Sequence, residues 1–262
     1  MQATNLKTNH LSAPLGMDAG TLFLSWQCAG GVRQTAYEIE VTAGAGTLWT
    51  SGKVLGSGMH TETPAAVPPK TQGQWRIRLW DENDQPGAWS EAEFETGLAQ
   101  SDWQGVWVCP ETEEPDIDCT DAINAFAKPN WEQKQAALEA SGKGQVQPYQ
   151  PHRPASYLRK TFTAPAGEGK RLYITARGLY AAWLNGKRVG DMVLAPGSFT
   201  ADKHLGAQTY DVTALVRDGE NELLIALGDG WYRSTSGVDG DRDLFGSELA
   251  VLFQLEVNGK AV

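Results

Sequence analysis

Apolar and polar positions alternate along the first hundred residues, in short stretches that Gly and Pro interrupt. The clearest stretch places three residues on one side of the alternation and three on the other: Trp75, Ile77 and Leu79 against Arg76, Arg78 and Trp80. A period of two residues is typical of a strand with one buried face. About seven such strands, separated by turn residues, predict an aligned β-sandwich over residues 1–100.

The same alternation returns at residue 156 and predicts a second, jelly-roll-like sandwich over residues 156–262. Two Asn-Gly pairs, Asn185-Gly186 and Asn258-Gly259, follow apolar stretches. Both are hairpin signals, because a two-residue type I′ turn needs positive φ at both positions. Only a few residues remain after the second pair for a return strand, so we expect this sandwich to be truncated and the chain to be part of a longer protein.

Residues 101–155 differ in composition and predict a linker or insert between the two sandwiches. The segment opens with the strand-like SDWQGVWV, and good helix formers between Asn130 and Gly142 predict one short helix. A connection of this length is usually functional or mobile, which makes it a candidate lid or docking arm. The whole chain is therefore expected to be mainly β, with two sandwich modules joined by a segment with a short helix.

Composition narrows the classes of partner. The formal net charge is −10 with a pI near 4.9, and no basic run offsets it, so we do not expect nucleic acid as a partner. No stretch approaches the ~18 apolar residues of a membrane span, and the first residues lack the apolar core of a leader. We expect no membrane partner and a cytoplasmic location, or secretion if a signal peptide was removed. The three cysteines lack zinc-site spacing and predict neither a disulfide framework nor a metal site.

Several motifs follow one another between residues 174 and 233: G-L-Y, L-N-G-K-R-V-G-D, L-A-P-G, T-Y-D-V-T, D-G-E-N and L-G-D-G-W-Y-R. This order resembles the bacterial α-L-rhamnosidase N-terminal domain. Upstream, WRIRLWDENDQPGAWSE resembles the last two strands of a fibronectin type III domain, in which Arg76 or Arg78 would stack on Trp89. The resemblance spans most of the chain from Gly16 onward.

The resemblance implies the non-catalytic front end of an enzyme that hydrolyses terminal α-L-rhamnose from glycosides. In that family the catalytic acid and base lie in a downstream (α/α)6 barrel, which would be this chain's partner in the same polypeptide. No catalytic residue can be carried over, and the chain alone is expected to be inactive. A free-standing carbohydrate-binding or adhesive sandwich protein is the alternative.

The residues themselves favour no hydrolytic site. A glycosidase needs two carboxyl groups, about 5–5.5 Å apart for retention or 6.5–9.5 Å for inversion. Three acidic candidates, at Asp239 to Asp243, at Glu220 with Asn221 and at Glu111 to Glu114, lie in polar loops where solvated carboxylates are the default. The first could hold Ca²⁺ through oxygen ligands, although a solvated loop is the commoner outcome. No nucleotide-binding loop is found, and no cofactor is expected.

The GDGWYR turn gathers two opposite charges and two large rings after an apolar stretch: Asp229, Trp231, Tyr232 and Arg233. Aromatic rings cover the C–H faces of sugars, and charged groups bind sugar hydroxyls, so these four are a candidate contact for rhamnose-containing carbohydrate. Alternatively, the rings pack at the rim of the sandwich and Arg233 pairs with Asp229.

Overall fold

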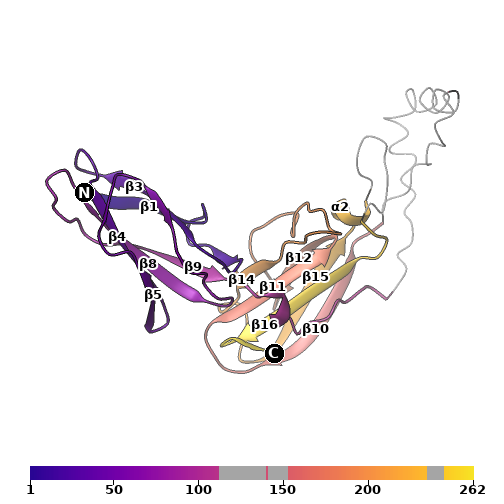
Figure 1. The fold of residues 1–262 in the computed structure, drawn as a ribbon. Helices are drawn as coiled ribbons and strands as arrows, with labels where there is room; N and C mark the ends of the chain where they lie inside the picture. The colour runs from indigo at the N-terminus through magenta and orange to yellow at the C-terminus, as the bar shows by residue number, and fades with distance from the viewer. Residues whose placement is uncertain (112–139, 141–152, 235–244) are drawn as a thin grey trace. The chain divides into compact units, whose positions relative to one another are not determined.

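The computed structural model describes residues 1–111, 140, 153–234 and 245–262, and these are mainly β-strand (Figure 1). The chain divides into two compact units, Met1–Gln104 and Gly105–Val262, each with its own sheets and its own hydrophobic core. The prediction of a mainly β protein built from sandwich modules is confirmed. The short helix predicted between Asn130 and Gly142 lies, except for Ala140, outside the described residues.

The first unit contains nine strands: β1 (Gln2–Thr8), β2 (Leu15–Met17), β3 (Phe23–Ala29), β4 (Ala36–Ala43), β5 (Gly46–Thr50), β6 (Val54–Leu55), β7 (His60–Glu62), β8 (Gln72–Trp80) and β9 (Ser90–Thr96). One sheet has the order β1-β3-β7. The other has the order β2-β9-β8-β4-β5, and β6 pairs with β4. A single 3-10 turn, Gln100–Asp102, follows β9.

Strand β8 follows the predicted alternation. Trp75, Ile77 and Leu79 are fully buried in the core between the two sheets. The indole Nε1 of Trp75 donates a hydrogen bond of 2.9 Å to the Oγ1 of Thr8 in β1. The largest side chain of this core therefore also joins β8 to a strand of the opposite sheet.

The opposite face of β8 carries a ladder of cations and rings. The guanidinium carbons of Arg76 and Arg78 lie 4.5 and 4.8 Å from the centre of the Trp89 ring, as the sequence predicts. The ladder extends further than predicted, because Arg78 also lies 5.0 Å from the Trp80 ring and the Lys53 Nζ lies 4.7 Å from it. These contacts cover Trp80, which is only 7% exposed although it lies on the outer face.

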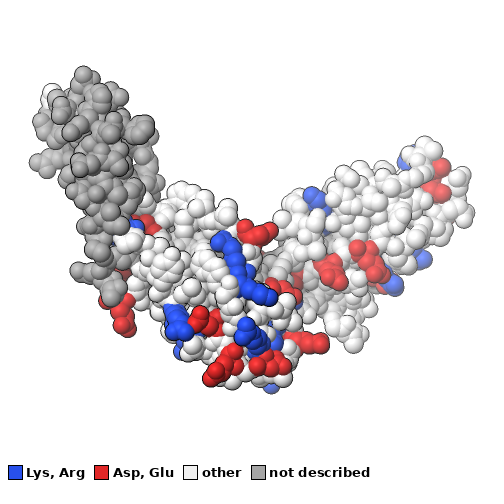
Figure 2. Space-filling model, turned by 180° about the vertical axis from the view of Figure 1, so that it is seen from behind, with Lys and Arg blue, Asp and Glu red and all other residues white. Residues whose placement is uncertain are grey.

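Carboxylates on the neighbouring strand β4 hold the two arginines in the ladder. Arg76 pairs with Glu40 and Arg78 with Glu38, each with an N to O distance of 2.6 Å. On the face drawn in Figure 2, Lys and Arg side chains likewise lie beside Asp and Glu side chains. The cations of the ladder are thus oriented from two sides, by rings and by carboxylates.

Replacing Trp89 with alanine is expected to lower the free energy of unfolding of the first unit by about 1–2 kcal/mol. The reason is the loss of two cation–π contacts worth about 0.5–1 kcal/mol each near a surface, with Trp89 itself half-buried. Urea denaturation followed by circular dichroism measures the change. Trp89→Phe, which keeps a weaker ring face, should lose less, and an unchanged midpoint for Trp89→Ala would show that the ladder contributes nothing.

In residues 153–234 and 245–262, the second unit has eight strands and one helical turn: β10 (Ser156–Ala164), β11 (Lys170–Arg177), β12 (Leu179–Leu184), β13 (Lys187–Arg188), β14 (Gln208–Asp211), β15 (Gly219–Gly228), α2 (Gly230–Arg233), β16 (Ala250–Val257) and β17 (Lys260–Ala261). One sheet has the order β10-β15-β12-β13 and the other β14-β11-β16-β17. The core between them includes Leu172, Ile225 and Leu227, none more than 1% exposed.

Both predicted hairpins are present in this unit. Asn185 and Gly186 have φ values of 51° and 77° between β12 and β13, and Asn258 and Gly259 have 50° and 72° between β16 and β17. Positive φ at both positions is what a type I′ turn requires, and a residue other than Gly or Asn would be strained there.

The strand expected at residues 101–108 is not formed. The structure has the 3-10 turn at Gln100–Asp102 and only an isolated bridge between Val108 and Val251. Alternation alone was misleading here, because Val106 is 74% exposed and no neighbouring strand buries one face of the segment. The main chain instead lies flat against β16 at Gly105, where a Cβ would collide with the carbonyl oxygen of Phe253.

Candidate functional site

The two charged residues of the predicted sugar contact lie against each other. Asp229 precedes the single turn of α2 and Arg233 ends it, so their spacing of four residues places both on one side of the turn. The Nη2 and Nε of Arg233 lie 2.6 and 2.7 Å from the Oδ1 of Asp229, and the two side chains are only 11% and 14% exposed. The pair braces the turn, as the structural alternative requires.

The two rings of the turn have different surroundings. Tyr232 packs against the core of the second unit, and its hydroxyl lies where a Cβ on Gly246 would be. Trp231 is 40% exposed. The turn itself depends on Gly230, whose φ is +52° and whose missing side chain leaves room for Leu179. Of the two rings, Trp231 is the more exposed, and Tyr232 is partly buried.

A small cavity lies beside these rings. It is lined by apolar residues from the end of β11 and several loops, including Pro196, Phe199, Trp231, Tyr232 and Phe245. Its volume of about 10 Å³ is close to the space of a single water molecule. A pyranose ring cannot enter it, so a sugar at this turn would meet only the outer side of Trp231.

A buried hydrogen-bond network holds one wall of this cavity. The hydroxyl of Tyr180 donates to the Oε1 of Gln208 at 2.8 Å and lies 3.2 Å from the hydroxyl of Tyr210. The Nε2 of Gln208 in turn donates to the carbonyl of Pro196 at 3.0 Å. Burial, followed by the hydrogen bond with Tyr210, raises the pKa of Tyr180. Tyr180 therefore acts as a neutral structural donor.

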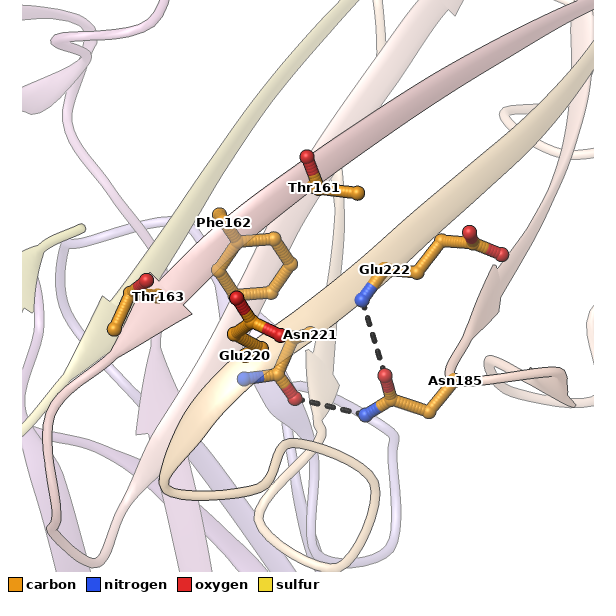
Figure 3. A pocket seen from close by; sticks show the side chains of 7 residues that line it. All are labelled: Thr161, Phe162, Thr163, Asn185, Glu220, Asn221 and Glu222. Carbon is orange, nitrogen blue, oxygen red and sulfur yellow. Dashed lines mark hydrogen bonds between the residues drawn. The ribbon is translucent and has the colours of Figure 1, made fainter.

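A larger concavity lies at the opposite end of β15, where Figure 3 shows the seven lining side chains. Its volume is about 430 Å³. The lining residues come from β10, from β15 and from the β12–β13 hairpin: Thr161, Phe162, Thr163, Asn185, Glu220, Asn221 and Glu222. This pocket was not predicted from the sequence, although the alternation of β10 already places Thr161 and Thr163 on one face.

The amides of this pocket are used in building it. The Asn185 Nδ2 donates to the Oδ1 of Asn221 at 2.8 Å, and the Asn185 Oδ1 accepts from the Glu222 main-chain N–H at 3.0 Å (Figure 3). Asn221, 4% exposed, also accepts from the N–H of Arg217 and donates to the carbonyls of Arg217 and Gly219. The candidate pair Glu220 and Asn221 thus contributes a turn-closing amide and an exposed carboxylate.

The remaining acidic candidates add no enclosed carboxylate pair to the described part of the chain. Glu222 pairs with Arg159 at 2.5 Å on an open sheet face. The segment from Asp239 to Asp243 and all but Glu111 of the run 111–114 lie outside the described residues. Within residues 1–111, 140, 153–234 and 245–262, no three His, Cys, Asp or Glu side chains gather as a metal site would require.

Two further features of the described ranges bear on the expected partners. Cys28 and Cys109 are exposed and unbonded to another cysteine. No helix among the residues that the structure covers is long and apolar enough to cross a membrane.

Comparison with protein families gives two matches in order along the chain. Residues 3–100 match the Rha78A-like, N-terminal immunoglobulin domain, and residues 168–261 match the Alpha-L-rhamnosidase N-terminal domain. The first sandwich thus matches an immunoglobulin model rather than a fibronectin type III model; the two domain types share the sandwich architecture.

Individual relatives agree with these matches. An α-L-rhamnosidase from Streptomyces avermitilis is 26% identical over 404 residues, covering 98% of this chain and 39% of that protein. One from Formosa agariphila is 30% identical over 260 residues, covering 90% of this chain and 25% of that protein. The structure of native α-L-rhamnosidase from Aspergillus terreus aligns with a TM-score of 0.77 at 26% identity, covering all of this chain and 28% of that one.

The chain therefore spans well under half the length of the relatives that it matches. The two family models together cover more than half of the chain, and they are both domains of one kind of enzyme. The chain therefore corresponds to the N-terminal region of α-L-rhamnosidases.

Proposed function

We propose that this chain serves an α-L-rhamnosidase that releases terminal α-L-rhamnose from glycosides, with the catalytic domain in the same polypeptide. The observation that carries the proposal is the ordered match of both units to N-terminal domains of such enzymes. Two longer relatives named α-L-rhamnosidase also support it, and this chain covers 39% and 25% of their lengths.

The geometry of the second unit supports a scaffold role for this portion. In its GDGWYR turn, Asp229 and Arg233 form an ion pair with each other. The amides of Asn185 and Asn221 close turns between strands. Groups committed to such contacts hold a fold in one shape, which is what a module bracing a neighbouring catalytic domain requires.

The chain alone is expected to give no turnover of an aryl α-L-rhamnoside. Hydrolysis needs two carboxyl groups on opposite sides of the scissile bond, about 5–9.5 Å apart, and the described residues hold no enclosed pair. Release of the aryl group at micromolar enzyme measures this. Turnover that disappears in Glu220→Gln or Glu222→Gln would place the active site in this chain and contradict the proposal.

Within the same proposal, the turn formed by Asp229, Trp231, Tyr232 and Arg233 stays our predicted contact for rhamnose-containing carbohydrate. Its support is the 40% exposure of Trp231 beside a rigid, paired Asp229 and Arg233. A single exposed ring is a small binding surface, so a dissociation constant near 1 mM, about −4 kcal/mol, is the affinity to look for. Amide NMR signals of residues 228–234 during titration with L-rhamnose provide the measurement.

A further inference from the structure

The outer face of the sheet β10-β15-β12-β13 changes character along its length. Cross-strand register forms four rows between β10 and β15: Tyr157 with Ala226, Arg159 with Leu224, Thr161 with Glu222, and Thr163 with Glu220. Trp183 of β12 lies beside Leu224 in the second row. The face therefore carries two rings, apolar side chains and Arg159 in its first two rows, and hydroxyls and carboxylates in the last two.

The polar end of this face is the 430 Å³ pocket of Figure 3. The hydroxyls of Thr161 and Thr163 and the carboxylate of Glu220 line it, and none of them bonds to another residue in the described part of the chain. Glu222, in contrast, is held by Arg159. The pocket thus offers two hydroxyls and one carboxylate that can accept or donate hydrogen bonds to a bound molecule.

The apolar end of the face offers two rings. Tyr157 is 69% exposed, and Trp183 is half-buried with the Arg188 guanidinium 5.9 Å from its ring centre. Successive rows lie two residues apart, or about 7 Å, so the face extends about 20 Å from Tyr157 to Thr163. This is a surface for an extended ligand rather than for a single small molecule.

We propose that this face binds a neutral oligosaccharide. One sugar occupies the pocket, where its hydroxyls bond to Glu220, Thr161 and Thr163. The apolar C–H faces of the following sugars stack on the rings of Trp183 and Tyr157. The inference rests on the proposed function, since a part of a glycoside-degrading protein meets such chains, and it adds to it a surface and a class of ligand.

The charges of the face select against other ligands. In the pocket, the carboxylate of Glu220 repels an oligosaccharide of uronic acids, while the charge of Glu222 is neutralised by Arg159. The one carboxylate of Glu220 supplies few of the 6–8 oxygen ligands that Ca²⁺ takes. A docked protein surface would have to supply partners for the threonine hydroxyls and Glu220, because each group left buried without one costs about 1–3 kcal/mol.

The test is a titration of the chain with a neutral α-linked rhamno-oligosaccharide, followed by amide NMR. We expect shifts in residues 157–163 and 220–224, and no shifts with oligogalacturonate at equal concentration. Glu220→Gln and Trp183→Ala should each weaken binding about tenfold, equivalent to 1.4 kcal/mol. Sugar binding is measured on this chain itself. The outcome for this proposal therefore does not depend on the result of the rhamnosidase assay.

Trp107→Ala is the matched control, since it removes an exposed ring that lies on Arg177 of β11, next to the bridge from Val108 to β16 in the other sheet of this unit. It should leave this binding unchanged. If Trp183→Ala does not fold, Tyr157→Ala replaces it, because Tyr157 is exposed. Shifts confined to residues 228–234, concentration-dependent self-association through residues 157–163, or no shifts up to tens of millimolar sugar, the weak end of the affinity scale, would each overturn the proposal.

Discussion

Trp75→Ala is expected to unfold the first unit at ordinary temperatures. The side chain is fully buried, and removing a buried Trp costs about 3–5 kcal/mol in lost contacts and cavity formation. Loss of the indole N–H also leaves the Oγ1 of Thr8, in a residue only 1% exposed, without its donor, which adds about 1–3 kcal/mol. Together these terms approach the roughly 5–15 kcal/mol of a whole domain.

Amide NMR dispersion of residues 1–104 and thermal denaturation measure this loss. Trp75→Phe retains most of the apolar volume and should be less destabilising, whereas Thr8→Val isolates the hydrogen bond. If Trp75→Ala melted at the original temperature, the core between the two sheets would not be held by β8.

Asp229→Ala is expected to lower the free energy of unfolding of the second unit by about 3 kcal/mol. The substitution removes the carboxylate that pairs with the Arg233 guanidinium, and the Arg233 side chain is only 11% exposed. Breaking a buried ion pair from one side costs about 3–5 kcal/mol, mostly because the remaining charge is poorly solvated. Chemical denaturation of the variant measures the difference.

A double-mutant cycle with Arg233→Met separates the pair from its surroundings. Asp229→Ala with Arg233→Met should be more stable than Asp229→Ala alone, because the double variant also removes the cation that has lost the Asp229 carboxylate. If Asp229→Ala kept full stability but lost a sugar-dependent NMR shift at residues 228–234, Asp229 would be a ligand anchor rather than a brace.

Local features of the fold could be predicted from the sequence. The alternation around Ile77 and the Asn-Gly pairs depend on a few neighbouring residues, so strand β8 and both hairpins were predicted correctly. The strand expected at residues 101–108 is not formed. A strand also needs a neighbouring strand with free hydrogen-bonding groups, and the main chain at Gly105 lies against β16 instead.

The structure of the GDGWYR turn could likewise be predicted only in part from the sequence. Its four residues are adjacent in sequence, and the spacing between Asp229 and Arg233 already permits an ion pair across one helical turn. The different exposure of Trp231 and Tyr232 depends on Leu179 and Gly246, which local sequence does not connect to them. The pocket was missed for this reason too, because β10 and β15 are paired across more than fifty residues.

The pairing of β11 with β16 has a consequence for how the protein is made. All strands of the first unit precede residue 97. In the second unit, β11 can pair with β16 only after β16 has been synthesised, and β16 ends at Val257. A ribosome adding about 5–20 residues per second needs roughly 4–17 s to cover the intervening chain. During that interval only β14 is available to pair with β11, so the second sheet of this unit stays incomplete until β16 has been made.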